Sequence, residues 1–464
     1  MKILFKGGRI VKEDEVVEKD LLVADEFIQD ILPGNSHKIT EADRVYDVSG
    51  KYIMPGVIDA HTHYALDSRG TITAEDFFTG TKSAAHGGVT CFIDFSDHKE
   101  DKTLAESARE RIKQAEEEAV IDFNLHQTVH YFDENIDREL RRIRDMGISS
   151  IKMFTTYKDV GYMIPERDRA ELLRTCEEIG LLPTVHAEDN NIIEKSRRKL
   201  IDKAEGEENL KLKDHPDLRP AEAEEAAINR LGNIAREENL PLYIEHISSA
   251  GGRQKFEHFK DSGARIAGET TPHYLFLDKS WLEESQGEKY YMVPPLRDKA
   301  DCKNLRQAID KGIFDVVATD HCAFSMAQKR KDTNPLNMLP GIPGSETLLP
   351  LIHKLVIEEK NMSYPYLCKL LSRNPARLFG LYPQRGVISR GSYADLVIFD
   401  PEKNLKLTSE NLHSAADYSP YSHITVKGFP AMTVQRGEII MNRGEFIGER
   451  GRGKFIDAGE SELL

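Results

Sequence analysis

The middle of the chain repeats one pattern, in which an apolar strand is followed by a helix-like stretch, over about residues 55–380. Eight strand candidates occur there, among them "VIDAHTH", "VTCFIDF", "SSIKMFTTY" and "FDVVATDHC". Helices are expected between most of them, for example around 74–86 and at 104–118. Strands that alternate with helices are typical of βαβ units, and eight such units can close into a barrel. The pattern therefore predicts an α/β fold, a parallel (β/α)8 barrel of the TIM type.

The two ends of the chain have a different texture. Segments such as "KILFKGGRIV" near the start and "RGVISRGSYADLVIFD" near the end alternate apolar and polar residues, as half-exposed strands do. We therefore expect residues 1–54 and 384–464 to form one small β-sandwich domain together, beside a barrel domain at 55–383. The polar segment 194–230 is expected to be a helical insertion, and the residues from about 448 onward a loose tail.

Charge and cysteine content narrow the class of protein. The formal net charge is −15 and no block rich in Lys and Arg occurs, which argues against nucleic acid or an anionic membrane as the main partner. The five cysteines are scattered and form no CxxC pair, so a disulfide framework is not expected. No apolar run approaches the ~20 residues of a membrane span, and the first residues lack the features of a signal peptide. The sequence thus predicts a soluble, cytoplasmic protein.

Polar side chains end several of the predicted strands. In a barrel the carboxyl ends of the strands meet at one mouth, where active sites lie. Residues two apart on a strand point to the same side, so His61 and His63 can reach one ion together. Imidazole and carboxylate ligands without thiolate suit zinc, or manganese, cobalt or iron in its place. The candidate ligands are His61, His63, Lys152, His186, His246 and Asp320.

Each of these residues also has an ordinary interpretation. A single histidine at a strand end is more often a hydrogen-bonded residue than a ligand, and only the combined set favours a metal site. The remaining histidines considered are expected to be structural or solvated: His86, His126, His130, His215, His258, His273, His353, His413 and His423.

Lys152 is the unusual member of the set, because it lies in the apolar stretch "SSIKMFTT". An unpaired ammonium buried there would be costly and would tend to lose its proton. A neutral amine can react with CO₂ to give a carbamate, an anionic oxygen ligand that could bridge two metal ions. The alternative is that Lys152 extends its ammonium to the rim of the barrel.

Several of these motifs together resemble a known family. "MPGVIDAHTH", "IKMF", "TVHAED", "IEHISS" and "ATDHC" are similar to the amidohydrolase superfamily, in the branch of hydantoinases, dihydropyrimidinases, allantoinases and dihydroorotases. The resemblance covers nearly the whole chain. It implies two divalent ions, with zinc expected: His61, His63 and Asp320 would hold one ion and His186 and His246 the other. N6-carboxylated Lys152 would bridge both.

The resemblance also implies a reaction. A metal-bridging hydroxide would open a cyclic amide of the hydantoin or dihydropyrimidine type, with Asp320 as general base. Tyr157 falls where hydantoinases place a tyrosine that hydrogen-bonds the oxyanion. Substrate contacts are also expected from Val293, in a position that is often serine. The Asn-Gly pair typical of D-hydantoinases is missing here, since Pro340 precedes Gly341, and Asn337 upstream is expected to take the place of that asparagine.

Other activities stay open at this point. Allantoinase or dihydroorotase activity is the main alternative, although dihydroorotases usually carry an arginine directly after HxH. Here Tyr64 and Ala65 follow, and Arg69 lies further on. A mononuclear deaminase would generally lack the bridging lysine, and a non-catalytic dihydropyrimidinase-like scaffold would lack metal ligands. The resemblance further implies a homo-oligomer, a tetramer or a dimer.

Overall fold

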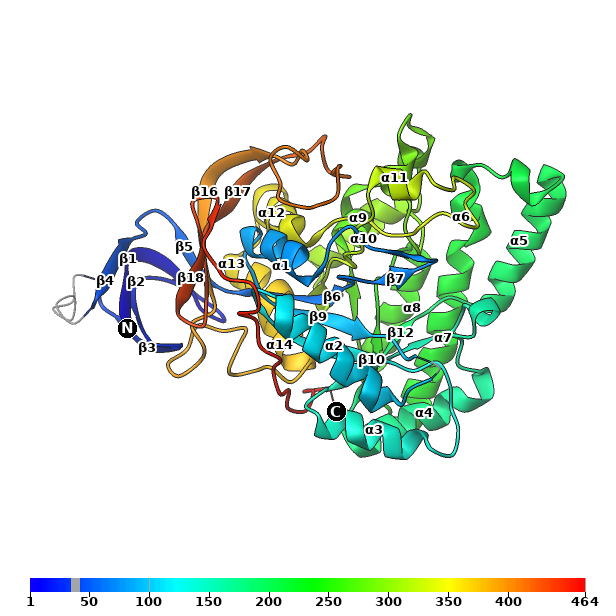
Figure 1. Ribbon diagram of the computed structural model, residues 1–464, viewed down its shortest axis with the longest axis horizontal. Helices are drawn as coiled ribbons and strands as arrows, with labels where there is room; N and C mark the ends of the chain where they lie inside the picture. Colours follow the sequence, from blue (N-terminus) through cyan, green and yellow to red (C-terminus); the bar gives the residue numbers. More distant parts are fainter. Residues whose placement is uncertain (35–41, 100, 464) are drawn as a thin grey trace.

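The computed structural model describes residues 1–34, 42–99 and 101–463. Its centre is an eight-stranded parallel sheet in which neighbours in space follow the order of the chain (Figure 1). The strands are β6 (Val57–Thr62), β9 (Val89–Ser96), β10 (Asp122–Thr128), β11 (Ser150–Phe154), β12 (Leu182–His186), β13 (Leu242–Ile244), β14 (Ile266–Thr270) and β15 (Val316–Val317). Most of their residues are buried on both faces, as expected of a parallel sheet covered by helices.

The first strand of this sheet is joined to the segment beyond the last one. Thr62 in β6 forms a parallel bridge with His321, and the amide of His63 donates to the carbonyl of His321 at 2.7 Å. The sheet therefore curls round on itself as the alternating pattern predicts, and the carboxyl ends of its strands share one mouth.

The longer helices lie between these strands, as expected for βαβ units. They are α1 (Phe77–His86), α2 (Leu104–Glu118), α3 (Ile136–Asp145), α4 (Glu166–Ile179), α5 (Asn190–Ala204), α7 (Ala221–Glu238), α8 (Ala250–Asp261) and α10 (Lys299–Asp310). Shorter pieces are α6 (His215–Leu218), α9 (Pro272–Phe276), α11 (Met326–Lys329), α12 (Leu348–His353), α13 (Tyr364–Cys368) and α14 (Asn374–Leu378), with the small hairpin β7 (Asp67–Ser68) and β8 (Thr71–Ile72). No helix in the described ranges combines the length and apolar character that crossing a bilayer requires.

Local capping decides where two of the predicted helices begin. Helix α2 spans 104–118 as predicted, because Thr103 and Glu106 form a capping box at its start. Helix α1 begins at Phe77 rather than near residue 74, because Asp76 caps it and accepts a hydrogen bond from the next turn. The insertion at 194–230 is helical as expected, and is built mainly from α5 and α7.

Both chain ends contribute to a second, nine-stranded sheet, which lies at the left of Figure 1. Strand β5 pairs antiparallel with β16 and so joins the two ends. Phe5, Leu21, Ile53, Leu396 and Val434 belong to one buried cluster on this sheet. The strands are β1 (Lys2–Val11), β2 (Val16–Ala24), β3 (Phe27–Leu32), β4 (Arg44–Asp47), β5 (Tyr52–Pro55), β16 (Leu396–Lys406), β17 (Thr425–Gln435), β18 (Glu438–Asn442) and β19 (Glu445–Phe446).

The shared sheet confirms that the two chain ends assemble together. Its division into the two layers of a sandwich, and the domain limits at 54 and 384, stay predictions.

The expectation of a loose tail is wrong. Phe455 forms a parallel bridge with Phe123 of β10, and Ala458 and Ser461 are buried. Arg265 donates two hydrogen bonds of 3.1 Å to the carbonyl of Leu463. The polar composition of this segment hides a few apolar side chains that cover the amino ends of the barrel strands.

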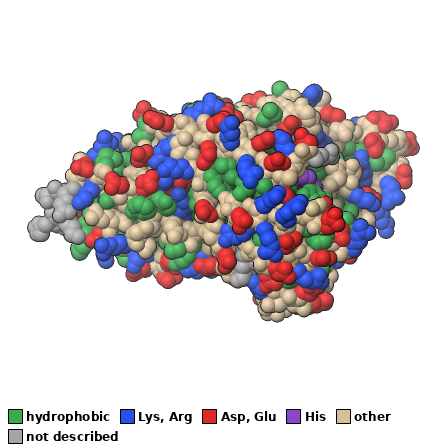
Figure 2. Space-filling model, turned by 60° about the horizontal axis from the view of Figure 1, so that its bottom comes forward, with side chains coloured by type: hydrophobic (Ala, Val, Ile, Leu, Met, Phe, Trp, Pro, Cys, Tyr) green, Lys and Arg blue, Asp and Glu red, His purple; other side chains and the backbone are tan. Residues whose placement is uncertain are grey.

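The surface carries charges of both signs. Figure 2 shows Lys and Arg side chains interspersed with Asp and Glu over one face of the molecule, with no wide area of basic residues alone.

Candidate metal centre

The six predicted ligands lie at the carboxyl ends of their strands. His61 is in β6, Lys152 in β11 and His186 at the end of β12, whereas His63, His246 and Asp320 follow β6, β13 and β15 within three residues. The ring centroids of His61 and His246 are 5.4 Å apart, and those of His186 and His246 are 4.7 Å apart. The structure therefore brings residues from five separate strand ends into one cluster.

Asp320 links the first half of the cluster. Its Oδ1 lies 3.2 Å from Nε2 of His61 and 3.3 Å from Nε2 of His63. The ligand atoms of these three residues all lie within 4.8 Å of one another. Two imidazole nitrogens and a carboxylate oxygen that converge in this way are a donor set for one divalent ion.

Buried carboxylates hold two of the imidazoles from behind. Nδ1 of His61 lies 2.6 Å from Oε1 of Glu269, and Nε2 of His186 lies 2.6 Å from Oε2 of Glu188. A carboxylate on one ring nitrogen fixes the orientation of the ring and leaves the other nitrogen for a metal. Arg219 in turn donates to Glu188, with Nε 3.1 Å from Oε2.

The electrostatics of the cluster also fit a cation. Burial opposes protonation of His61, but the charges of Glu269 and Asp320 outweigh it and raise its pKa to about 10. Burial lowers the pKa of His63, His186 and His246, so these three imidazoles are neutral and can act as ligands. The negative charge of Glu269 and Asp320 favours a proton on His61 when no metal is bound, and a bound metal ion would neutralise the same charge.

An unpaired ring nitrogen and an unusual backbone conformation strengthen this interpretation. Nε2 of His61 makes no hydrogen bond of good geometry to any residue in the described ranges, although it is buried. His246, Asp320 and Tyr157 have positive φ angles of 36°, 49° and 64°. Such left-handed backbone is uncommon for residues other than glycine and concentrates at functional sites.

Lys152 is buried but paired. Its side chain is not at the rim, since the residue is only 3% exposed, and this rules out the rim alternative. Its Nζ lies 2.7 Å from Oε2 of Glu245 and 4.4 Å from the centre of the Phe95 ring. The sequence predicted an unpaired amine here. The carboxylate partner comes from a distant strand end and corrects that expectation.

The three predicted substrate contacts lie in different surroundings. The ring of Tyr157 lies 5.4 Å from that of His186 and beneath the Arg219 guanidinium, whose Cζ is 4.9 Å from the ring centre. Val293 is half-buried and precedes a cis peptide bond to Pro294. Asn337 is exposed. Of these three, the structure thus brings Tyr157 against a predicted ligand.

Arg69 is exposed and bound to the loop that contains Asn337. Its Nη1 donates to the carbonyls of Leu336 at 3.0 Å and Met338 at 3.2 Å. The arginine that sequence analysis weighed as a substrate cation therefore fixes one loop of the mouth to another.

Sequence reasoning missed the carboxylates around the cluster. Glu188 follows His186 by two residues, Glu245 directly precedes His246, and Glu269 is the second residue of the motif "GETTPHYL". Their positions next to strand ends were the available signal. Among the histidines set aside as structural, His126 and His215 do bond backbone carbonyls, with Nε2 2.9 Å from Ala60 O and Met292 O.

Comparisons with known proteins agree with this geometry. A model of the amidohydrolase family matches residues 52–440. A D-phenylhydantoinase of Escherichia coli K12 is 34% identical over 460 residues, which cover 98% of this chain and 98% of that protein.

Solved structures give the same result. Dihydropyrimidinase from Brevibacillus agri superimposes with a TM-score of 0.95 at 30% identity, covering 99% of each chain. L-Hydantoinase from Arthrobacter aurescens gives a TM-score of 0.88 at 27% identity, covering 98% of this chain and 99% of that one. The chain is therefore a member of the amidohydrolase family, in its cyclic-amidohydrolase branch.

Proposed function

We propose that the protein is a binuclear metal-dependent hydrolase that opens cyclic amides of the hydantoin or dihydropyrimidine type. The observation that carries the proposal is the convergence of Asp320 Oδ1 with Nε2 of His61 and His63, at 3.2 and 3.3 Å, in a mouth that His186 and His246 complete. The relatives named hydantoinase and dihydropyrimidinase support the substrate class.

The ligands would divide between two ions, with zinc expected. His61, His63 and Asp320 would hold the first, and His186 and His246 the second, with Lys152 bridging both as a carbamate. When bound, the ions would provide hydroxide from a bridging water near neutral pH and polarise the amide carbonyl. The neutral state of three imidazoles and the buried position of Lys152 support this assignment.

Asp320 would act as the general base. Burial opposes its ionisation, but His61 and His63 outweigh burial and lower the pKa of its carboxyl group. An ionised carboxylate here can take the proton of the attacking water and then pass it to the leaving ring nitrogen, which completes the opening of the ring.

Tyr157 would bind the carbonyl oxygen as negative charge develops there. Burial raises the pKa of its phenol, so the hydroxyl stays protonated and can donate. Val293 would contribute through its backbone and Asn337 through its side chain.

Allantoin and dihydroorotate are the alternative substrates within this proposal. For dihydroorotate the substrate carboxylate needs a cation, and Nη1 of Arg69 is already bonded to two backbone carbonyls. All predicted ligand positions hold residues able to bind metal, which supports an enzyme over a scaffold. A homotetramer or dimer in the cytoplasm is proposed with it, and the five free cysteines suit a reducing compartment.

The direct test is a ring-opening assay. Purified protein supplied with zinc and bicarbonate would be offered hydantoin, dihydrouracil, allantoin and dihydroorotate, and loss of the ring would be followed by absorbance. We expect the first two to be opened fastest. If all four rings stay closed while two ions per chain are bound, the substrate class is wrong.

A further inference from the structure

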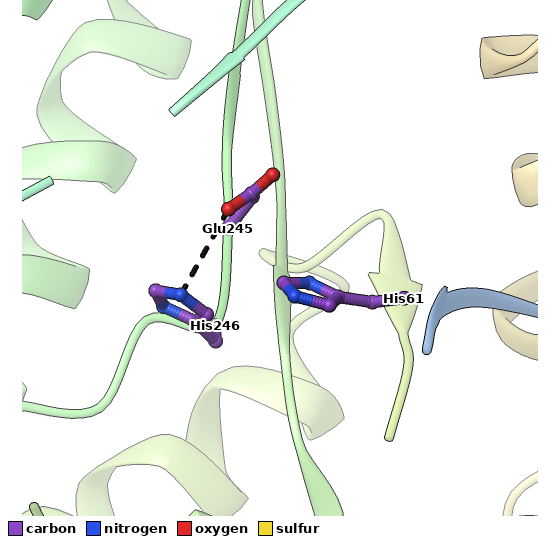
Figure 3. A group of neighbouring side chains, drawn as sticks. All are labelled: His61, Glu245 and His246. Carbon is purple, nitrogen blue, oxygen red and sulfur yellow. Dashed lines mark ion pairs between the residues drawn. The ribbon is translucent and has the colours of Figure 1, made fainter. Parts of the chain in front are cut away.

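Glu245 is a carboxylate inside the cluster that the ligand assignment above does not use. It directly follows β13 and is only 3% exposed. Its Oε2 lies 2.7 Å from Nζ of Lys152 and 3.8 Å from Nε2 of His246. Figure 3 shows its carboxylate beside the His246 ring, on the side that faces His61.

The backbone explains how adjacent residues reach the same space. In a regular strand successive side chains point to opposite faces, so Glu245 and His246 would be separated. The positive φ of His246, 36°, breaks this alternation at the end of the strand. The ligand atoms of His61, Glu245 and His246 consequently lie within 4.8 Å of one another.

A threonine aims the carboxylate. Oγ1 of Thr184, in β12, donates to Oε1 of Glu245 at 2.6 Å. This bond satisfies one oxygen and turns the other, Oε2, toward Lys152 and His246. The carboxylate therefore has a fixed orientation before any ion arrives.

The charge of Glu245 must be balanced in every state of the site. With an unmodified lysine, the ammonium of Lys152 balances it. If Lys152 carries a carbamate, the ammonium is replaced by an anionic group attached to the same nitrogen, and Glu245 then lies beside a second negative charge. A buried carboxylate left beside another anion is strongly unfavourable unless a cation contacts both.

We propose that Glu245 is itself a ligand of the metal centre, binding through Oε2 the ion held by His186 and His246. This inference rests on the proposed function, since it assumes that Lys152 bridges as a carbamate. It gives the second ion a carboxylate of its own, matching the carboxylate that Asp320 gives the first. Thr184 acts as a positioning residue for this ligand.

The test is a metal-binding measurement on Glu245→Gln, which keeps the size of the side chain and removes its charge. Metal-free protein would be titrated with zinc against a competing chelator, and bound zinc would be counted by mass spectrometry. We expect the affinity for one of the two ions to fall by at least about tenfold, since loss of a group that only supports a ligand already costs about 10- to 100-fold. Thr184→Val should give a smaller loss for the same ion.

The matched control is Glu224→Gln. Glu224 is equally buried and accepts from Ser248 and Ser249, so its substitution also removes a buried carboxylate. Its zinc affinities should equal those of the wild type. A Glu245→Gln protein that is folded by circular dichroism and binds two ions with wild-type affinity would overturn the inference.

A zinc-loaded crystal of the wild-type protein decides the matter without any variant. Anomalous density should place an ion within about 2.2 Å of Oε2. Glu245 still paired with an unmodified Lys152, and more than about 3 Å from both ions, would overturn the inference. Ring opening that fails while Glu245 binds metal counts only against the proposed substrates, so the two failures are distinguishable.

Discussion

Nδ1 of His61 lies 2.6 Å from Oε1 of Glu269, and both side chains are almost completely buried. The second oxygen of Glu269 accepts from the hydroxyl of Tyr243 at 2.8 Å. The imidazole is therefore held by a carboxylate that is itself held, and its Nε2 is directed at Asp320. Such support from behind a ligand sets how tightly the ligand binds its metal.

Glu269→Gln should weaken zinc binding at the ion of His61, His63 and Asp320, by about 10- to 100-fold. The amide retains the shape of the side chain but loses the charge that orients and polarises His61. Zinc titration of the metal-free protein measures this directly. Unchanged binding would show that His61 needs no such support.

Asp320→Asn should retain much of the metal and lose turnover. The amide can still contact an ion through its oxygen, but it cannot accept the proton of the attacking water. We expect kcat to fall by about 10²- to 10⁴-fold, as for other losses of a general base. The rate of ring opening and the zinc content should be measured on one preparation, and a near-normal rate would remove Asp320 from the role of base.

Lys152→Ala should abolish ring opening and reduce the bound zinc to one ion or fewer per chain. It removes the proposed carbamate bridge between the two ions. A mononuclear deaminase on the same barrel would tolerate the change. Metal analysis and the hydantoin assay together separate the two cases, and full activity with two bound ions would contradict the bridging role.

The pH dependence of stability should reflect His215, a buried histidine that is not among the candidate metal ligands. Burial lowers its pKa to about 3, and its Nε2 donates to the carbonyl of Met292. Because the folded pKa lies below the unfolded value of about 6.5, the unfolded state binds the proton first. This histidine's contribution is therefore complete above pH 6.5 and is lost as the pH falls toward 3, by about 1.4 kcal/mol per pH unit.

Replacing His215 with Gln should remove that part of the slope. Denaturant unfolding of metal-free wild type and His215→Gln between pH 4.5 and 6.5 measures the difference. His258→Gln, which changes an exposed histidine of α8, is the matched control. Parallel curves for wild type and His215→Gln would contradict the assignment.

The strand-helix alternation and the convergence of the six candidate residues could be predicted because their signals are local. HxH at a strand end requires only that residues two apart share a side. Each predicted strand or helix is likewise recognised from the pattern of its own residues. The partner of Lys152 could not be predicted in this way. It depends on the register of three strands, in which Lys152 lies opposite Thr184 and Thr184 opposite Tyr243.

Side-chain period then decides the outcome. Glu245 is two residues beyond Tyr243 and so follows its direction, which brings it over Thr184 and Lys152. A single sequence does not contain that register. The packed tail was missed for a related reason, since Phe455 pairs with Phe123 of β10 and Ala458 belongs to one buried cluster with Ile58 of β6 and Cys91 of β9.

The pairing of β5 with β16 has a consequence for how the molecule is made. During synthesis the first five strands leave the ribosome long before β16, the strand that pairs with β5. The edge of β5 that β16 covers therefore stays unpaired while the barrel residues are being made. The barrel must therefore fold around an unfinished edge, and completion of the sheet is a late step that depends on very distant contacts. A chain truncated within the barrel would lack β16, and the edge of β5 would be open to pairing with strands of other molecules.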